Sequence, residues 1–150
     1  MRFLVVIFSF FCTACVTTSG SGVVRPEYKE YSVSHALSDF ESKKISDGQL
    51  IYISGYLTFG DDKHNLWGNE EGYKYIRETM PPLKDPAWRD CISLIYYGKF
   101  RKTLLKYNEK YVVVLGHISR HMPKSDEVNL GSCNEISISL DGDDARILAR

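Results

Sequence analysis

Two histidines stand four residues apart, which is the spacing of two zinc ligands on one helix. They are His117 and His121. The preceding residues, 111–119, have the pattern of a strand, in which four residues span about 13 Å. One zinc ion could not take both side chains without a turn between them. We therefore expect hydrogen-bonded or solvated histidines and no metal site.

Two acidic clusters could in principle do chemistry. Residues 61–64 (Asp-Asp-Lys-His) could hold an acid/base pair, and residues 141–144 (Asp-Gly-Asp-Asp) faintly resemble a calcium loop. The first cluster is more typical of a hairpin turn, and the second lacks the alternating acids and final Glu of an EF-hand. The chain has no Gly-rich phosphate loop, no Gly-x-Ser-x-Gly and no His-Glu-x-x-His. We predict a protein that is not an enzyme and carries no cofactor.

Aromatic and basic residues interleave in the segment 96–107, as in surfaces that bind extended polymers. The candidate ligand surface is Tyr96, Tyr97, Lys99, Phe100, Arg101 and Tyr107. The alternative is an amphipathic helix with a solvated basic side. The 150-residue chain has 19 basic and 19 acidic residues, so its net charge of zero argues against nucleic acid. A glycan, a peptide or an envelope protein is the expected ligand.

The N-terminus has the pattern of a secretory signal. Arg2 carries a positive charge, residues 3–11 are apolar except for Ser9, and a small-residue stretch follows. The apolar run is shorter than the roughly 20 residues of a membrane-spanning helix. We expect residues 1–14 to be a signal peptide, and the alternative is a buried N-terminal strand or helix.

The end of this segment resembles the lipobox of bacterial lipoproteins. Ala14 matches the residue before the cleavage site and Cys15 matches the lipidated cysteine, whereas Cys12 stands where the pattern usually has Leu. The resemblance implies membrane attachment through acyl chains on Cys15. Because Val16 and not Asp follows, it also implies an outer-membrane anchor facing the periplasm. Ordinary secretion, with a cut near Ala14, is the alternative.

The remaining cysteines form a candidate pair. Cleavage and acylation leave Cys91 and Cys133 in an oxidising compartment, each at the start of an expected strand. Adjacent strand ends could bring their Cβ atoms together. A bridge from residue 91 to residue 133 would stabilise the fold by on the order of 4 kcal/mol. We predict this disulfide, with two independent buried thiols as the alternative.

The elements that must position these residues follow from hydrophobic periodicity. Strands are expected at 50–60, 64–67, 91–97, 111–119 and 135–140, and short helices at 32–44 and 100–107. Residues 68–90 contain three prolines and are expected to be irregular. The alternation of Ser137 and Ser139 with isoleucines predicts a half-exposed strand, and residues 143–150 are expected to form a final helical turn. Residues 15–30 are interpreted as a flexible tether and residues 31–150 as one domain.

Two of the expected strands share a pattern. Residues 50–57 and 111–118 both follow a turn and both end in apolar-x-Gly-x-apolar, with Gly55 and Gly116 at equivalent positions. A glycine inside a strand indicates a bulge or a bend, so the pattern indicates two strands that curve around one small barrel. The order of three strands, a helix and two strands resembles an OB-fold, a five-stranded Greek-key barrel. This resemblance covers residues 50–140 and implies a mainly β fold with short helices. An open β-sandwich is the alternative.

Two hypotheses on function remain at this point. The first is a lipid-anchored envelope protein that acts as a non-enzymatic binding or structural module. The second is a soluble periplasmic or secreted enzyme, or an enzyme inhibitor, acting through residues 68–90.

Overall fold

A computed structural model describes residues 29–60, 63–82, 85, 90–96, 98–120, 133 and 135–150. The elements in chain order are β1 (Glu30–Ser32), α1 (Val33–Glu41), β2 (Gln49–Gly60), β3 (Lys63–Trp67), α2 (Glu70–Thr79), β4 (Cys91–Tyr96), a 3₁₀ turn (Gly98–Phe100), α3 (Arg101–Lys106), β5 (Lys110–Arg120), β6 (Ile136–Leu140) and β7 (Arg146–Ala149).

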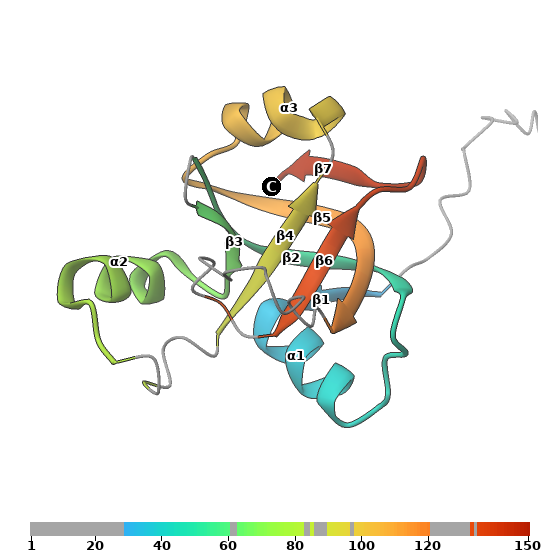
Figure 1. Cartoon of the computed structure of the whole chain (residues 1–150), viewed down its shortest axis with the longest axis horizontal. Helices are drawn as coiled ribbons and strands as arrows, with labels where there is room; N and C mark the ends of the chain where they lie inside the picture. Colours follow the sequence, from blue (N-terminus) through green and yellow to red (C-terminus); the bar gives the residue numbers. More distant parts are fainter. Residues whose placement is uncertain are drawn as a thin grey trace, which may run out of the picture.

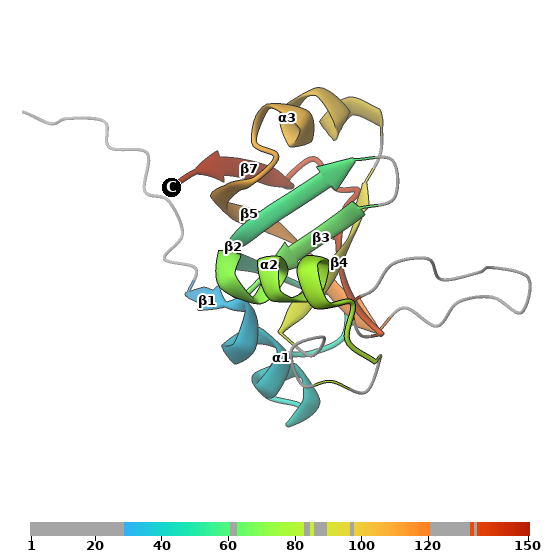
Figure 2. The ribbon, with the colours of Figure 1, turned by 90° about the vertical axis from the view of Figure 1, so that its left-hand side faces the viewer.

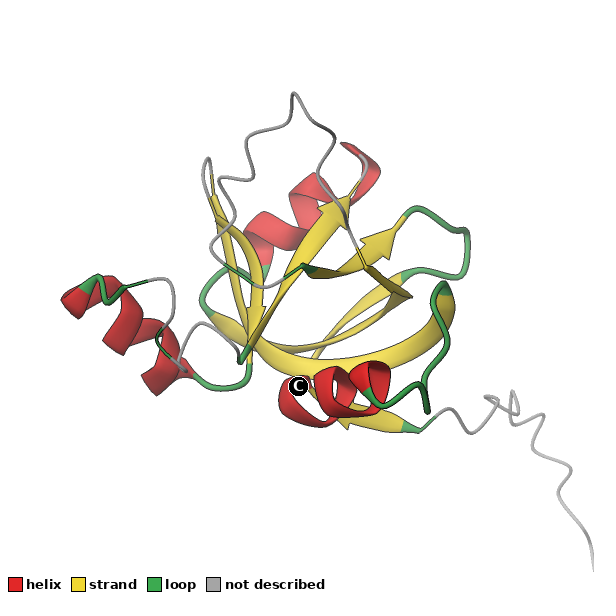
Figure 3. Cartoon of the chain, turned by 60° about the horizontal axis from the view of Figure 1, so that its bottom comes forward, coloured by secondary structure: helices red, strands yellow, loops and turns green. Residues whose placement is uncertain are grey.

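Five of the strands close into a barrel (Figure 1). Their order around it is β2, β3, β4, β6 and β5, and β5 pairs back onto β2. Only the β4–β6 pair is parallel in this ring. The helix α3 connects the third and fourth strands, β4 and β5. This is the OB-like Greek-key barrel that the sequence predicted, not the open sandwich. Figure 3 shows the strands curving around a common centre with the helices outside.

Two short strands lie outside the ring. β1 runs parallel to β2, and β7 runs antiparallel to β5. The prediction of a helical turn at 143–150 is therefore wrong. Ile147 pairs with Val114 and turns toward the barrel core, so the pairing with β5 decides the local structure.

Both glycines of the shared pattern lie where a long strand changes partner. β2 pairs with β1 up to Ser54 and with β3 from Tyr56 onward, so Gly55 marks the change. β5 pairs with β7 up to Leu115 and with β6 from the residue after Gly116. A Cβ on Gly55 would lie 2.6 Å from a carbonyl oxygen of β3, and one on Gly116 would lie 2.6 Å from a carbonyl oxygen of β6. The glycines allow the strands to cross closely at the two corners of the barrel.

The core fills the barrel, and two helices close its ends. Alternate residues of β2, including Ile53 and Leu57, are fully buried inside. The helices α1 and α3 lie at opposite ends (Figures 1 and 2) and contribute Val33 and Leu104 to the same core. Ser32 caps α1, since its hydroxyl accepts a hydrogen bond from the amide of His35.

The prediction that residues 68–90 are irregular is wrong for the first half of this segment. Residues 70–79 form α2, which stands beside the barrel (Figure 2) and buries Tyr73 and Ile76. Asn69 caps this helix by accepting a 2.6 Å hydrogen bond from the amide of Gly72. The prolines that argued against a helix begin only at Pro81, after its end. No helix in the described part of the chain is long and apolar enough to cross a membrane.

Candidate functional site

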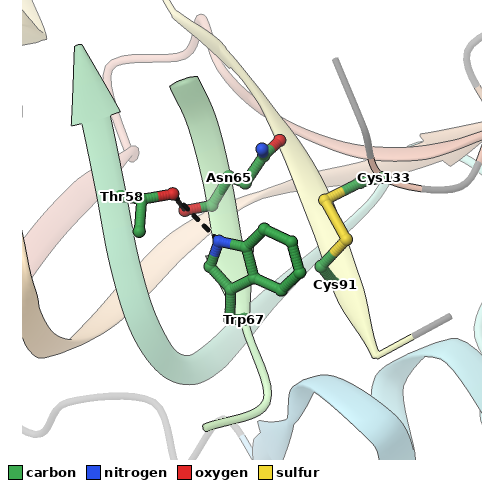
Figure 4. Close-up of a disulfide and its surroundings, with 5 residues drawn as sticks. All are labelled: Thr58, Asn65, Trp67, Cys91 and Cys133. Atoms are coloured by element: carbon green, nitrogen blue, oxygen red, sulfur yellow. Dashed lines mark hydrogen bonds between the residues drawn. A yellow bond between two sulfur atoms is a disulfide. The ribbon is translucent and has the colours of Figure 1, made fainter. Parts of the chain in front are cut away.

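The disulfide between Cys91 and Cys133 is present, with Cα atoms 5.4 Å apart (Figure 4). Cys91 is the first residue of β4, and Cys133 lies three residues before β6. Because β4 and β6 are parallel neighbours, their starts lie at the same end of the barrel. The prediction from strand starts is therefore confirmed.

A satellite cluster surrounds the disulfide on the outer face of the barrel, between β2, β3 and α2. Its members are Tyr56, Trp67, Tyr73, Ile76, Cys91 and Cys133. The indole nitrogen of Trp67 donates a 2.9 Å hydrogen bond to the hydroxyl of Thr58. Burial raises the pKa of Tyr56, and the carboxylate of Glu70 raises it further, so this phenol stays neutral at pH 7. The cluster attaches α2 and the disulfide to the barrel.

The predicted aromatic and basic surface divides into core and solvated parts. Tyr96, Phe100 and Tyr107 are half-buried and pack against the barrel core. The ring of Tyr96 lies edge-on to Phe59, at 4.9 Å, and to His64, at 5.2 Å. These rings thus already have packing partners within the fold.

The basic side chains of this surface point to solvent. Lys99 lies 3.6 Å from the carboxylate of Asp143 and over the ring of Phe100, and Arg101 is exposed on α3. Tyr97 lies outside the described residues. In the described part of this surface the aromatic side chains pack inward and the basic side chains are solvated. This arrangement fits the alternative interpretation, an amphipathic helix with a solvated basic side.

The outer face of β3, β4, β6 and β5 carries a row of polar side chains that the sequence analysis missed. In register, Asn65 pairs with Ser93, Ser93 with Ser137, and Ser137 with Ser119. The prediction that 135–140 is half-exposed needs correction, because Ser137 faces outward from the barrel and is nevertheless fully buried. The hydroxyls of Ser119 and Ser137 lie 3.4 Å apart.

Within the part of the chain that the structure describes, two atoms of this row are buried without a hydrogen-bond partner. They are Oδ1 of Asn65, a residue only 3% exposed, and Oγ of Ser93. Figure 4 shows Asn65 next to the disulfide, with Trp67 two residues further along β3. A buried polar atom that lacks a partner costs about 1–3 kcal/mol. The row therefore contains buried hydrogen-bonding capacity that the described residues leave unused.

A shallow depression of about 610 Å³ continues this row toward the other end of the barrel. Its lining includes Ile95, His117, Ser119, Ser139 and Asp141. Nδ1 of His117 lies 2.9 Å from the backbone carbonyl oxygen of residue 48. Since a carbonyl only accepts, Nδ1 donates this hydrogen bond, and Nε2 is the ring nitrogen that can accept from a ligand. Hydroxyl, imidazole and carboxylate groups thus converge on one hollow.

The other candidates from the sequence do not join this hollow. His117 is hydrogen-bonded as expected, whereas His121 and both aspartates of the 61–64 cluster lie outside the described residues. The ring of His64 packs against the rings of Phe59 and Tyr96. No group of three His, Cys, Asp or Glu side chains able to hold a metal ion occurs among the residues that the structure describes.

Comparisons with protein-family models, with curated proteins and with solved structures find no match for this chain.

Proposed function

We propose that the chain is a lipid-anchored cell-envelope protein that acts as a binding module and not as an enzyme. The lipobox-like segment ending at Cys15 supports the anchor. The pair Cys91–Cys133 supports an extracytoplasmic location, because disulfides persist in oxidising compartments. An outer-membrane anchor that faces the periplasm is the arrangement we propose.

The observation that carries the binding role is the depression, on which the side chains of His117, Ser119 and Ser139 converge with the carboxylate of Asp141. Serine hydroxyls both donate and accept, while Nε2 of His117 and the carboxylate of Asp141 accept. A ligand that suits this set is uncharged and rich in hydroxyl or amide donors, as a glycan is. Asp141 would repel a phosphate backbone, in keeping with the zero net charge of the chain.

Ligand binding is tested with a soluble N-acetylhexosamine oligosaccharide and NMR amide shifts. We expect shifts at Ser139 and its neighbours, and an affinity at least fivefold lower for His117→Ala and for Ser139→Val. The exposed Met80, directly after α2, supplies the control, Met80→Ala, which should bind as the wild type does. Shifts confined to α3, or no shifts at millimolar oligosaccharide, would reject the depression as the glycan site.

Lipidation is tested separately with labelled palmitate in growing cells. The wild-type chain should incorporate the label and fractionate with membranes, whereas Cys15→Ser should lose the label and become soluble. Cys12→Ser is the matched control, because the resemblance places the lipid only on Cys15, and its labelling should persist. Undiminished labelling of Cys15→Ser would overturn the anchor.

A further inference from the structure

The chain contains two Asp-Gly steps, and both border the depression described above. Asp47-Gly48 lies in the turn before β2, and Asp141-Gly142 lies directly after β6. Both glycines and Asp141 line the depression. Both aspartates are exposed to solvent, so exposure alone does not distinguish the two steps. The hydrogen bonds around them do.

An Asp-Gly step can rearrange without an enzyme. The amide nitrogen of the glycine attacks the side-chain carboxyl carbon of the aspartate, because glycine has no Cβ to hinder the approach. The carboxyl group loses its hydroxyl and the amide loses its hydrogen, together as water, and a cyclic imide forms. Water then opens this ring. Opening at the former main-chain carbonyl leaves the main chain running through the side chain, which is isoaspartate. One water is released and one is consumed, so no other reactant is needed.

Hydrogen bonds hold both reacting groups of the Asp47-Gly48 step. The amide of Gly48 donates a 2.8 Å hydrogen bond to the carbonyl oxygen of Ile118. The side chain of Asp47 accepts a 3.1 Å hydrogen bond from the amide of Arg120. Attack requires the nitrogen to turn from β5 toward the carboxyl carbon, so the first bond must break and the second must loosen. We therefore expect this step to be protected in the folded protein.

The Asp141-Gly142 step has neither restraint within the residues that the structure covers. Among them, the amide of Gly142 donates no hydrogen bond, and the carboxylate of Asp141 has no hydrogen-bond or ion-pair partner. The carbonyl oxygen of Gly142 accepts from the amide of Ala145 and from Lys99, so the chain after the step is held while the reacting groups are not. We propose that Asp141 is a site of spontaneous isoaspartate formation and that Asp47 is not.

The conversion changes the depression itself, and this consequence rests on the binding role proposed above. Isoaspartate adds one carbon atom to the main chain and transfers the free carboxylate from the side chain to the main-chain carbon. The carboxylate at position 141 then no longer has the placement beside His117 and Ser139 that the hollow provides. We expect the isoaspartate form to bind the oligosaccharide at least threefold more weakly than the unconverted chain.

The test is peptide mapping of the full-length Cys15→Ser chain after several weeks at neutral pH in heavy-oxygen water. Ring opening incorporates one heavy oxygen atom, so mass spectrometry reports each conversion, and chromatography separates isoaspartate peptides from aspartate peptides. In the folded protein we expect conversion at Asp141 at least tenfold faster than at Asp47. In the urea-unfolded chain the two steps should convert at similar rates, because the hydrogen bonds around Asp47 and Gly48 are then lost.

Gly142→Ala is the matched variant. Its Cβ would lie 3.4 Å from Nε2 of His117, an ordinary contact that the fold can accept, while the methyl group hinders the attack. Conversion at position 141 should slow at least fivefold in this variant, both folded and unfolded.

Two results would overturn the proposal. The first is a folded wild-type protein in which Asp141 stays unconverted while the unfolded chain converts. The second is equal conversion at Asp47 and Asp141 in the folded protein. Because conversion is measured without a ligand, a chain that binds no oligosaccharide would contradict the proposed function and not this modification site.

Discussion

Replacing Gly55 with alanine is expected to lower the free energy of unfolding by about 3 kcal/mol. The new Cβ would lie 2.6 Å from the carbonyl oxygen of Trp67 and 2.8 Å from a side-chain carbon of Leu66. The closest of these atoms belongs to the backbone, so relief requires β3 to move away from β2. That movement would open the barrel at the place where β2 changes partner. Urea denaturation followed by circular dichroism measures the effect.

Two further alanine variants make this experiment specific. Gly116→Ala should be destabilised by a similar amount, because its Cβ would lie 2.6 Å from the carbonyl oxygen of Ser139. Gly60→Ala is the matched control on the same strand as Gly55, since nothing lies within 4 Å of its Cβ, and it should change stability by less than about 0.5 kcal/mol. Equal stability of all three variants would contradict the two-corner description of the barrel.

Removal of the disulfide by the double variant Cys91→Ala/Cys133→Ala is expected to cost about 2–5 kcal/mol. The bridge joins residues 42 positions apart and thereby restricts the unfolded chain. Its sulfur atoms also fill the cluster that includes Trp67 and Tyr73, so the alanines remove packing from the base of α2. The barrel itself should remain folded, because its core cluster is separate from that of the disulfide. Thermal unfolding of wild type and variant measures the difference.

Reduction of the wild-type chain separates the two contributions. Reduction breaks the covalent link but keeps the sulfur atoms, so the reduced wild type should lie between the oxidised protein and the double variant. A double variant as stable as the oxidised protein would show that the bridge contributes nothing to the fold.

The barrel was predictable because its strands are long and strongly patterned. The apolar residues around Gly55 and around Gly116 predict two bent strands. The turn residues show where one element ends and the next begins, and so give the succession of elements along the chain. The edge strands were missed because β1 and β7 have three and four residues, which is too short for a periodic signal. The helix α2 was missed because the prolines after it outweighed the capping residue Asn69 and the spacing of Tyr73 and Ile76.

The candidate site was harder to predict from the chain. Interleaved aromatic and basic residues drew attention to the segment 96–107, but Tyr96, at the end of β4, and Phe100, in the 3₁₀ turn, pack against the core. Periodicity does not reveal this, because the segment changes from a strand to a short helix within a few residues. The signal for the polar outer face was the alternation of Ser137 and Ser139 with the apolar residues Ile136, Ile138 and Leu140. Only the strand register shows that Asn65, Ser93 and Ser119 extend this signal across neighbouring strands.

The central proposal is that this barrel, which carries the Cys91–Cys133 disulfide, is processed and anchored by a lipid outside the cytoplasm. Mass spectrometry of the chain isolated from membranes without reduction tests it most directly. We predict an N-terminal peptide that begins at an acylated Cys15, together with a peptide pair linked through Cys91 and Cys133. A chain that retains residues 1–14 with an unmodified Cys15, or that carries free thiols at Cys91 and Cys133, would contradict the account.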